Sequence, residues 1–130
     1  MALDAADKME ILELAARYNH AIDFGDGEAW AGTFTEDGVF NGGPQPVSGH
    51  VALAQFVAGF GQQMAGARHW TNNHIVDGDG DSATHSCYLN LVQTKDGGNS
   101  IITGVYNDKL AKVNGQWRFT ERNVTPDARD

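Results

Sequence analysis

The chain has few of the features that mark secreted, membrane or disulfide-stabilised proteins. Its 130 residues include one cysteine, Cys87, so no internal disulfide can form. No apolar run approaches the roughly 20 residues that cross a bilayer. The first residues also lack the basic and apolar regions of a secretory signal. We therefore expect a cytoplasmic protein. Cys87 lies in an alternating strand pattern, which favours a small buried apolar role over a nucleophilic one.

Positive charge is also scarce. Nine Lys and Arg residues stand against 17 Asp and Glu residues, which gives a formal net charge of -8. Phosphate contacts need Lys or Arg, so this composition disfavours nucleic acids and anionic membranes as partners. A hydrophobic, uncharged small molecule is the more natural ligand. The length and the 41% hydrophobic content predict a single domain over residues 1–130.

Metal and nucleotide motifs are missing as well. The segment DGDGD at 77–81 starts like a calcium loop, but Ser82 replaces the required Gly and Tyr88 stands where the bidentate Glu belongs. The five histidines show no HxxxH or His-carboxylate spacing, and no Gly-rich phosphate-binding motif is present. We therefore predict no metal site and no cofactor.

The first half of the chain predicts helices. Ile11, Leu14, Tyr18 and Ile22 recur at helical spacing, and Asp7 is the expected N-cap of this helix. Gly25 and Gly27 end it. A short helix at 28–34, a brief strand at 38–41 and a third helix near 50–60 are expected to follow.

The second half predicts a β-meander. Turn signals at 77–80, 96–98 and 114–115 separate four apolar-alternating stretches. The expected strands cover 68–76, 82–94, 100–113 and 116–124. Strands of this length imply a strongly curved antiparallel or mixed sheet. With three helices packed on it, the sheet forms an α+β cone whose interior can hold an apolar ligand.

Three segments carry a resemblance to a known family. They are RYNHAIDFGD at 17–26, FTEDGVF at 34–40 and WRF at 117–119. Together with the order of elements, they resemble the SnoaL-like branch of the nuclear transport factor 2-like superfamily over nearly the whole chain. The resemblance implies one SnoaL-like domain with the cone-shaped fold. That fold hosts dehydratases, isomerases, cyclases, dehydrohalogenases and proteins without catalytic activity, so the pocket residues decide the function.

Asp23 and His69 are the residues that the resemblance singles out. The chain is similar to the bile-acid 7α-dehydratases and the hexachlorocyclohexane dehydrochlorinase in placing an Asp near the end of the first helix and a His at the start of the next long strand. Tyr18, five residues before the Asp, matches the dehydratase arrangement. Ketosteroid isomerase has its base as an Asp on the first strand, where this chain has Val39-Phe40-Asn41. Isomerisation of that type is therefore disfavoured.

These three side chains can carry out proton transfer. A neutral His69 imidazole can remove a proton from carbon, Asp23 can orient the ring, and Tyr18 can protonate a leaving hydroxyl. We predict a cofactor-independent lyase that performs a dehydratase-type elimination on a hydrophobic cyclic small molecule. An isomerase or cyclase with the same Asp-His pair, and a non-catalytic ligand-binding or assembly module, remain open. Tyr18 also lies on the apolar stripe of its helix, so a core role is open too.

Strand alternation selects further pocket residues. His69, Thr71 and Asn73 share one face, so Asn73 is predicted to bind substrate, whereas His74 lies on the opposite face. His85 has no recognisable acid partner. The resemblance implies a homodimer or a higher homo-oligomer formed through the open sheet face, and the apolar residues on both sheet faces agree with it. The remaining predicted lining residues are Trp30, Tyr88, Asn90 and Tyr106.

Overall fold

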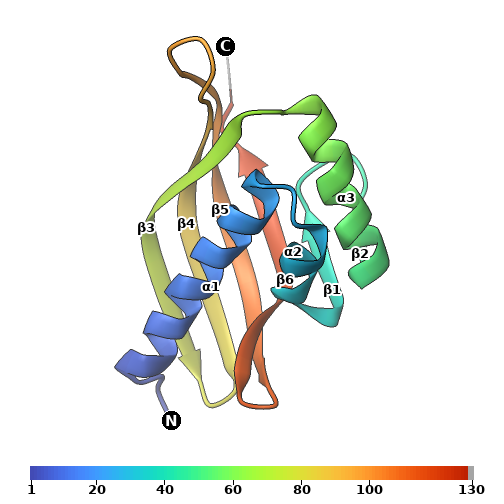
Figure 1. Ribbon diagram of the computed structural model, residues 1–130. Helices are drawn as coiled ribbons and strands as arrows, with labels where there is room; N and C mark the ends of the chain where they lie inside the picture. Colours follow the sequence, from blue (N-terminus) through green and yellow to red (C-terminus); the bar gives the residue numbers. More distant parts are fainter. Residues whose placement is uncertain (129–130) are drawn as a thin grey trace.

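The computed structural model describes residues 1–128, in which three helices pack on one six-stranded, strongly curved sheet (Figure 1). The predicted cone-shaped α+β fold is confirmed. The helices are α1 (Ala5–Asp23), α2 (Gly27–Gly32) and α3 (His50–Gln63). Among the described residues, no helix is both long and apolar enough to span a membrane.

The start of α1 differs from the sequence prediction. Asp4 is the N-cap, because its carboxylate accepts a hydrogen bond from the backbone N–H of Asp7 at 2.8 Å. Asp7 instead accepts bonds from Trp117 Nε1 at 3.0 Å and Lys112 Nζ at 3.2 Å. These two contacts lower the pKa of the Asp7 carboxyl. They also join the start of α1 to the turn between the last two strands of the sheet.

The sheet has the strand order β2-β1-β6-β5-β4-β3. The last four strands form the predicted antiparallel meander, and β1 pairs with β6 in parallel. Strand β2 was not predicted from the sequence, and β1 begins four residues earlier than predicted. The strands are β1 (Phe34–Asn41), β2 (Val47–Ser48), β3 (Ala67–Asp79), β4 (Ser82–Gln93), β5 (Asn99–Val113) and β6 (Gln116–Pro126).

The inside of the cone lies between the helices and the concave face of the sheet. Helix α1 crosses the long strands, while α3 lies beside β1 at the other side of the molecule (Figure 1). Large apolar side chains fill the centre of this space, where Trp30, Leu53, Trp117 and Phe119 have no exposed surface. Such close packing fixes the position of α1 on the sheet.

A β-bulge in β3 changes which side chains face inward. Asn72 pairs with Tyr88 and Ile75 with Ser86, so Asn73 and His74 together oppose Cys87. Asn73 has a left-handed backbone, with φ 57°, and is exposed. The alternation therefore shifts by one residue after Asn73. The prediction that Asn73 faces the interior and His74 the outside is wrong.

A second bulge, in β6, also shifts the alternation of inward and outward side chains by one residue. Lys109 pairs with Glu121 and Leu110 with Phe119, which leaves Thr120 as the extra residue. Phe119 and Arg122 therefore both face the interior, although strict alternation would place them on opposite faces.

The left-handed backbone at Asn73 predicts how this position responds to substitution. Asn73→Val should lower the free energy of unfolding by about 1–2 kcal/mol, because a β-branched residue disfavours this backbone region. Asn73→Gly should be nearly neutral. Asn72→Val, at an exposed neighbouring position with an extended backbone, is the matched control. Urea denaturation measures all three, and equal effects of Val at 72 and 73 would contradict the assigned bulge.

Candidate active site

Asp23 and His69 form a close pair at one end of the cone. Asp23 is the last residue of α1, and His69 is the third residue of β3. The Nδ1–H of His69 donates to Asp23 Oδ1 at 2.6 Å, and the backbone N–H of His69 donates to both carboxylate oxygens at 3.1–3.2 Å. The two side chains are only 7% and 6% exposed. Because Nδ1 carries the proton toward Asp23, Nε2 of the neutral ring is left with a free lone pair.

A second contact between α1 and β3 lies beside this pair. Asn19, one helical turn before Asp23, donates from Nδ2 to Thr71 Oγ1 at 3.1 Å. The four helical residues from Asn19 to Asp23 rise about 6 Å, and the two strand residues between His69 and Thr71 span about 6.6 Å. Because these lengths agree, α1 and β3, running in opposite directions, can make both contacts. The buried Oδ1 of Asn19 has no hydrogen-bond partner among the described residues. Sequence reasoning missed Asn19, although its i, i+4 spacing to Asp23 is a usable signal.

A groove of about 450 Å³ borders the pair, between the last turns of α1 and the start of β3. Asn19, Phe24 and Thr71 line it together with Asp23 and His69. At its rim the Arg68 guanidinium lies over the Phe24 ring, 4.6 Å from the centroid. The walls are thus partly polar, and a closed apolar cavity around the pair stays a prediction.

Tyr18 does not accompany the pair. It has no exposed surface, and its ring packs 5.2 Å from Trp30 and 6.0 Å from both Tyr106 and Phe119, measured between centroids. Burial raises the pKa of Tyr18 well above its usual value, and the nearby Tyr106 adds to the increase. The structure therefore places Tyr18 in the aromatic core, the alternative that its helical position had left open.

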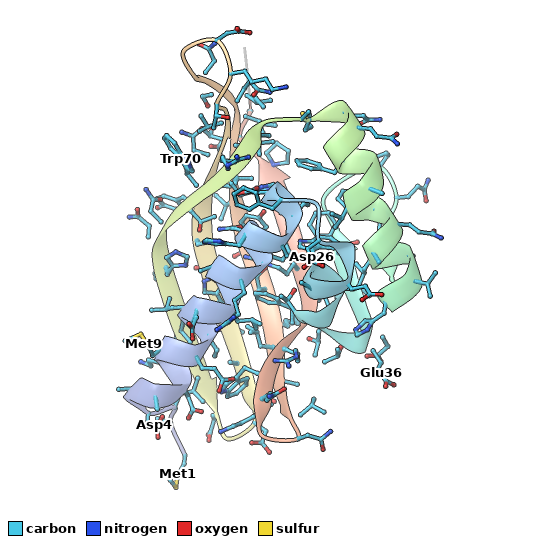
Figure 2. All side chains as sticks on the ribbon, in the orientation of Figure 1. Met1, Asp4, Met9, Asp26, Glu36 and Trp70 are labelled. Carbon is cyan, nitrogen blue, oxygen red and sulfur yellow. The ribbon has the colours of Figure 1, made fainter. Side chains whose placement is uncertain are left out.

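The other predicted lining residues fall into two groups. Trp30 and Tyr106 are buried in the same aromatic core as Tyr18. Tyr88 and Asn90 lie on the opposite sheet face, where Tyr88 is 55% exposed and Asn90 pairs with the equally outward Trp70 (Figure 2). The structure brings neither Tyr88 nor Asn90 to the Asp23–His69 pair.

Comparison with known proteins assigns the family. The model of the SnoaL-like domain matches residues 4–123. The chain belongs to the SnoaL-like domain family. The predicted resemblance to the SnoaL-like branch of the nuclear transport factor 2-like superfamily is thus confirmed. No curated protein matches the chain at a significant level.

Solved structures similar to this SnoaL-like domain come from several bacteria. A protein of unknown function with a cystatin-like fold from Nostoc punctiforme is 35% identical, with a TM-score of 0.91 over 98% of this chain and 96% of that chain. An Asp-to-Asn variant of a protein of unknown function from Mycobacterium tuberculosis is 34% identical, with a TM-score of 0.89 over 95% and 73% of the two chains. A Catenulispora acidiphila protein in complex with S-DNPA is 28% identical, with a TM-score of 0.83 over 95% of each chain.

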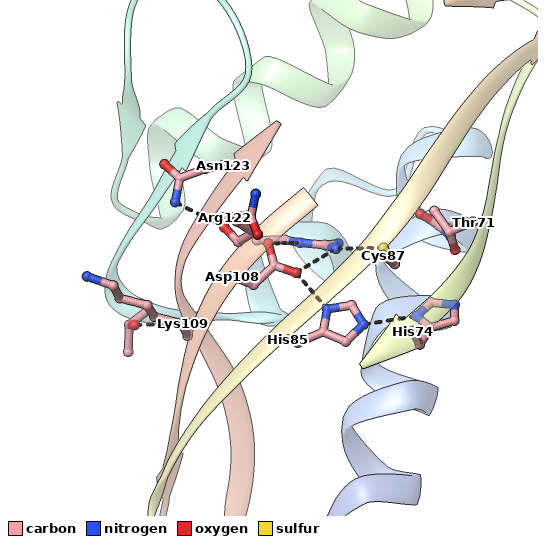
Figure 3. A network of polar contacts seen from close by, with 11 residues as sticks. Thr71, His74, His85, Cys87, Asp108, Lys109, Arg122 and Asn123 are labelled. Carbon is pink, nitrogen blue, oxygen red and sulfur yellow. Dashed lines mark hydrogen bonds and ion pairs between the residues drawn. The ribbon is translucent and has the colours of Figure 1, made fainter. Parts of the chain in front are cut away.

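The SnoaL-like domain also contains a buried polar network that the sequence did not reveal (Figure 3). His85, Asp108 and Arg122 stand directly opposite one another on β4, β5 and β6. His85 Nδ1 donates to Asp108 Oδ2 at 2.6 Å, and Arg122 donates to both Asp108 oxygens at 2.9 and 3.0 Å. His74 Nδ1 lies 2.9 Å from His85 Nε2. The acid partner of His85, which no sequence pattern indicated, is thus Asp108.

Burial and charge shape the protonation of this network. The Arg122 guanidinium lies 3.9–4.3 Å from the ring centroids of Tyr106, Tyr18 and Phe119. Burial opposes its charge, but attraction to Asp108 and to the two tyrosines outweighs burial and raises the pKa of Arg122. Burial, together with the neighbouring His85, lowers the pKa of His74.

Cys87 lies next to this network. Burial raises the pKa of its thiol to about 11, so the side chain stays protonated near neutral pH. The predicted burial of Cys87 is confirmed.

The ion pair inside the SnoaL-like domain predicts strongly non-additive stability changes. Asp108→Ala should lower the free energy of unfolding by about 3–5 kcal/mol, because it leaves the buried Arg122 charge without its partner. The double variant Asp108→Leu with Arg122→Met should be markedly more stable than Asp108→Ala alone.

The adjacent exposed pair provides the control for this experiment. Lys109 and Glu121 also stand opposite each other, with Nζ and Oε2 3.6 Å apart, but Lys109 is 71% exposed. Glu121→Ala should change the free energy of unfolding by less than about 1 kcal/mol. Urea denaturation measures all variants. Similar losses for Asp108→Ala and Glu121→Ala would contradict the assigned role of the buried pair.

Proposed function

We propose that this SnoaL-like protein is a cofactor-independent lyase that removes water from a hydrophobic cyclic small molecule. The observation that supports the proposal most directly is the buried Asp23–His69 pair. Its carboxylate fixes Nδ1 of the imidazole, and Nε2 is the ring nitrogen without a partner among the described residues. A neutral imidazole oriented in this way is a suitable general base near neutral pH.

In the proposed elimination, His69 Nε2 accepts a proton from a carbon next to a carbonyl group. The C–H electron pair forms the new C=C bond as the C–O bond to the β-hydroxyl breaks. The leaving hydroxide takes the proton back from the imidazolium, so water is released and His69 returns to its neutral form. The carboxylate of Asp23 stabilises the imidazolium between the two transfers. This route does not require Tyr18, which lies in the core.

Asn19 and Thr71 are suited to hold the substrate. Both line the groove beside the pair, and Asn19 Oδ1 is a buried acceptor without a partner among the described residues. The polar side chains of Asn19 and Thr71 in the groove wall suit a ligand that carries hydroxyl groups. The groove volume of about 450 Å³ is within the usual range for small-molecule sites, roughly 300–1,000 Å³.

The same pair also supports an isomerase or a cyclase. An isomerase would return the proton to a different carbon, and a cyclase would use the carbanion to form a C–C bond. A relative with a TM-score of 0.83 was solved in complex with S-DNPA, which equally supports a protein that binds a ligand without converting it. Reaction products separate these alternatives.

The proposal predicts loss of turnover when either member of the pair changes. A panel of cyclic β-hydroxyketones is incubated with the protein in D₂O and followed by mass spectrometry. His69→Ala and Asp23→Asn should each lower turnover by roughly 10²–10⁴-fold, because the base or its orientation is lost. Glu36→Gln, an exposed substitution that also removes one carboxylate charge, is the control and should retain wild-type turnover.

The products decide the reaction class. Loss of water supports the lyase. A new compound without loss of water, separated from the substrate by chromatography, indicates an isomerase or a cyclase. Retention of an unchanged ligand by the purified protein indicates a binding module. Wild-type turnover in His69→Ala would refute the proposed base.

A further inference from the structure

We propose that His74, His85 and Cys87 form a binding site for a borderline-soft divalent metal ion such as Zn²⁺. One ring nitrogen of each histidine and the Cys87 sulfur all lie within 4.8 Å of one another. The residues come from the neighbouring strands β3 and β4, and Figure 3 shows the His74 ring facing the His85 ring on the side where Cys87 lies.

The backbone explains why these three side chains meet. His85 and Cys87 are two residues apart on β4 and therefore share the inward face. The bulge at Asn73 turns His74 inward, opposite Cys87. Without the bulge, His74 would point to the outside of the sheet, which is why the His spacing in the sequence gave no sign of a site.

The orientation of His85 suits metal coordination. Its Nδ1–H donates to Asp108 at 2.6 Å, so Nε2 presents a lone pair toward His74. Histidine ligands of metals usually donate their other N–H to such a carboxylate. The two facing nitrogens are 2.9 Å apart, and nitrogen ligands at about 2.0–2.1 Å from a tetrahedral Zn²⁺ are roughly 3.3 Å apart. A small separation of the rings is enough to admit the ion.

The charges around the three donors are compatible with a bound thiolate. Binding replaces the thiol proton of Cys87 with the metal and releases one proton per ion. Arg122 Nη2 lies 3.9 Å from Cys87 Sγ and can donate to the thiolate, while the Arg122 charge itself is balanced by Asp108. One sulfur and two imidazoles favour Zn²⁺ over Ca²⁺ or Mg²⁺, which prefer oxygen ligands. The three protein ligands leave a fourth position for water or another small ligand.

The proposed metal site is separate from the Asp23–His69 pair. His69 uses its Nδ1 on Asp23 and is not one of the three donors. Without an ion, the two histidines are joined by a hydrogen bond, with His74 Nδ1 donating to His85 Nε2. A purely structural network and a metal site therefore differ in one measurable property, the binding of a metal through the Cys87 sulfur.

Titration of the untagged full-length protein with Co²⁺ tests the proposal. Tetrahedral Co²⁺ bound to a thiolate gives visible d–d bands and a sulfur-to-cobalt charge-transfer band in the near ultraviolet. We expect both at one equivalent, followed by displacement with Zn²⁺. Cys87→Ser should abolish the charge-transfer band, and His74→Ala should weaken binding at least tenfold. Circular dichroism of each variant verifies that it is folded.

Two histidine variants are the controls. His20→Ala removes an exposed histidine outside the donor set, and His69→Ala removes the proposed catalytic base. Both should bind Co²⁺ like the wild type, so the metal site and the proposed lyase activity can fail independently. Zn²⁺ in excess should also raise the Tm of the wild type but not of Cys87→Ser.

The proposal is overturned if the wild type shows no charge-transfer band. It is also overturned if folded Cys87→Ser and His74→Ala bind Co²⁺ as tightly as the wild type. Either result would leave the cluster as a hydrogen-bonded structural network.

Discussion

The β-bulges at Asn73 and Thr120 determine which polar side chains enter the cone. Each adds one residue to its strand and reverses the direction of every side chain beyond it. Without them, His74 and Arg122 would point out of the cone, and the buried Asp108 would lose its guanidinium partner. Loss of the cationic partner of a buried carboxylate is strongly destabilising, so the ion pair depends on the bulge in β6. The two bulges thus bring His74 and Arg122 to the part of the concave face where His85 and Asp108 already point inward by regular alternation.

Helix α1 divides this concave face into two regions. Asn19 and Asp23, one turn apart, contact Thr71 and His69 on the edge strand β3. Tyr18, only one residue from Asn19, turns about 100° around the helix and packs over Arg122, 4.2 Å from its guanidinium. One helix thus positions the Asp23–His69 pair beside an open groove and covers the ion pair of Asp108 and Arg122, which is almost completely shielded from water. The rotation of α1 about its own axis therefore separates the groove beside Asp23 and His69 from the buried network beneath Tyr18.

Sequence patterns predicted the direction of a side chain correctly only up to the first bulge in its strand. Asp23 and His69 were paired through the family resemblance, which matches both positions, and His69 lies before the bulge in β3, where alternation still holds. The prediction for Asn73 and His74 failed a few residues later, because alternation does not reveal a bulge. Asp108 and Arg122 are 14 residues apart and meet only through the β5–β6 register, which includes the bulge at Thr120. The parallel pairing of β1 with β6 is likewise non-local and left no signal in either segment.

The interior of the cone contains more polar and charged side chains than stability alone requires. A core selected for stability alone would fill the position of the Arg122–Asp108 pair with apolar side chains, since such replacements are often neutral or stabilising. This interior instead retains an ion pair, two histidines and a cysteine. In the described part of the chain, four buried polar atoms have no hydrogen-bond partner, on Tyr18, Asn19, Trp30 and Arg122. Each unpaired buried group costs about 1–3 kcal/mol, a large fraction of the stability of a small domain. Of these four residues, Asn19 lines the groove beside the Asp23–His69 pair, whereas Tyr18, Trp30 and Arg122 lie in the packed interior.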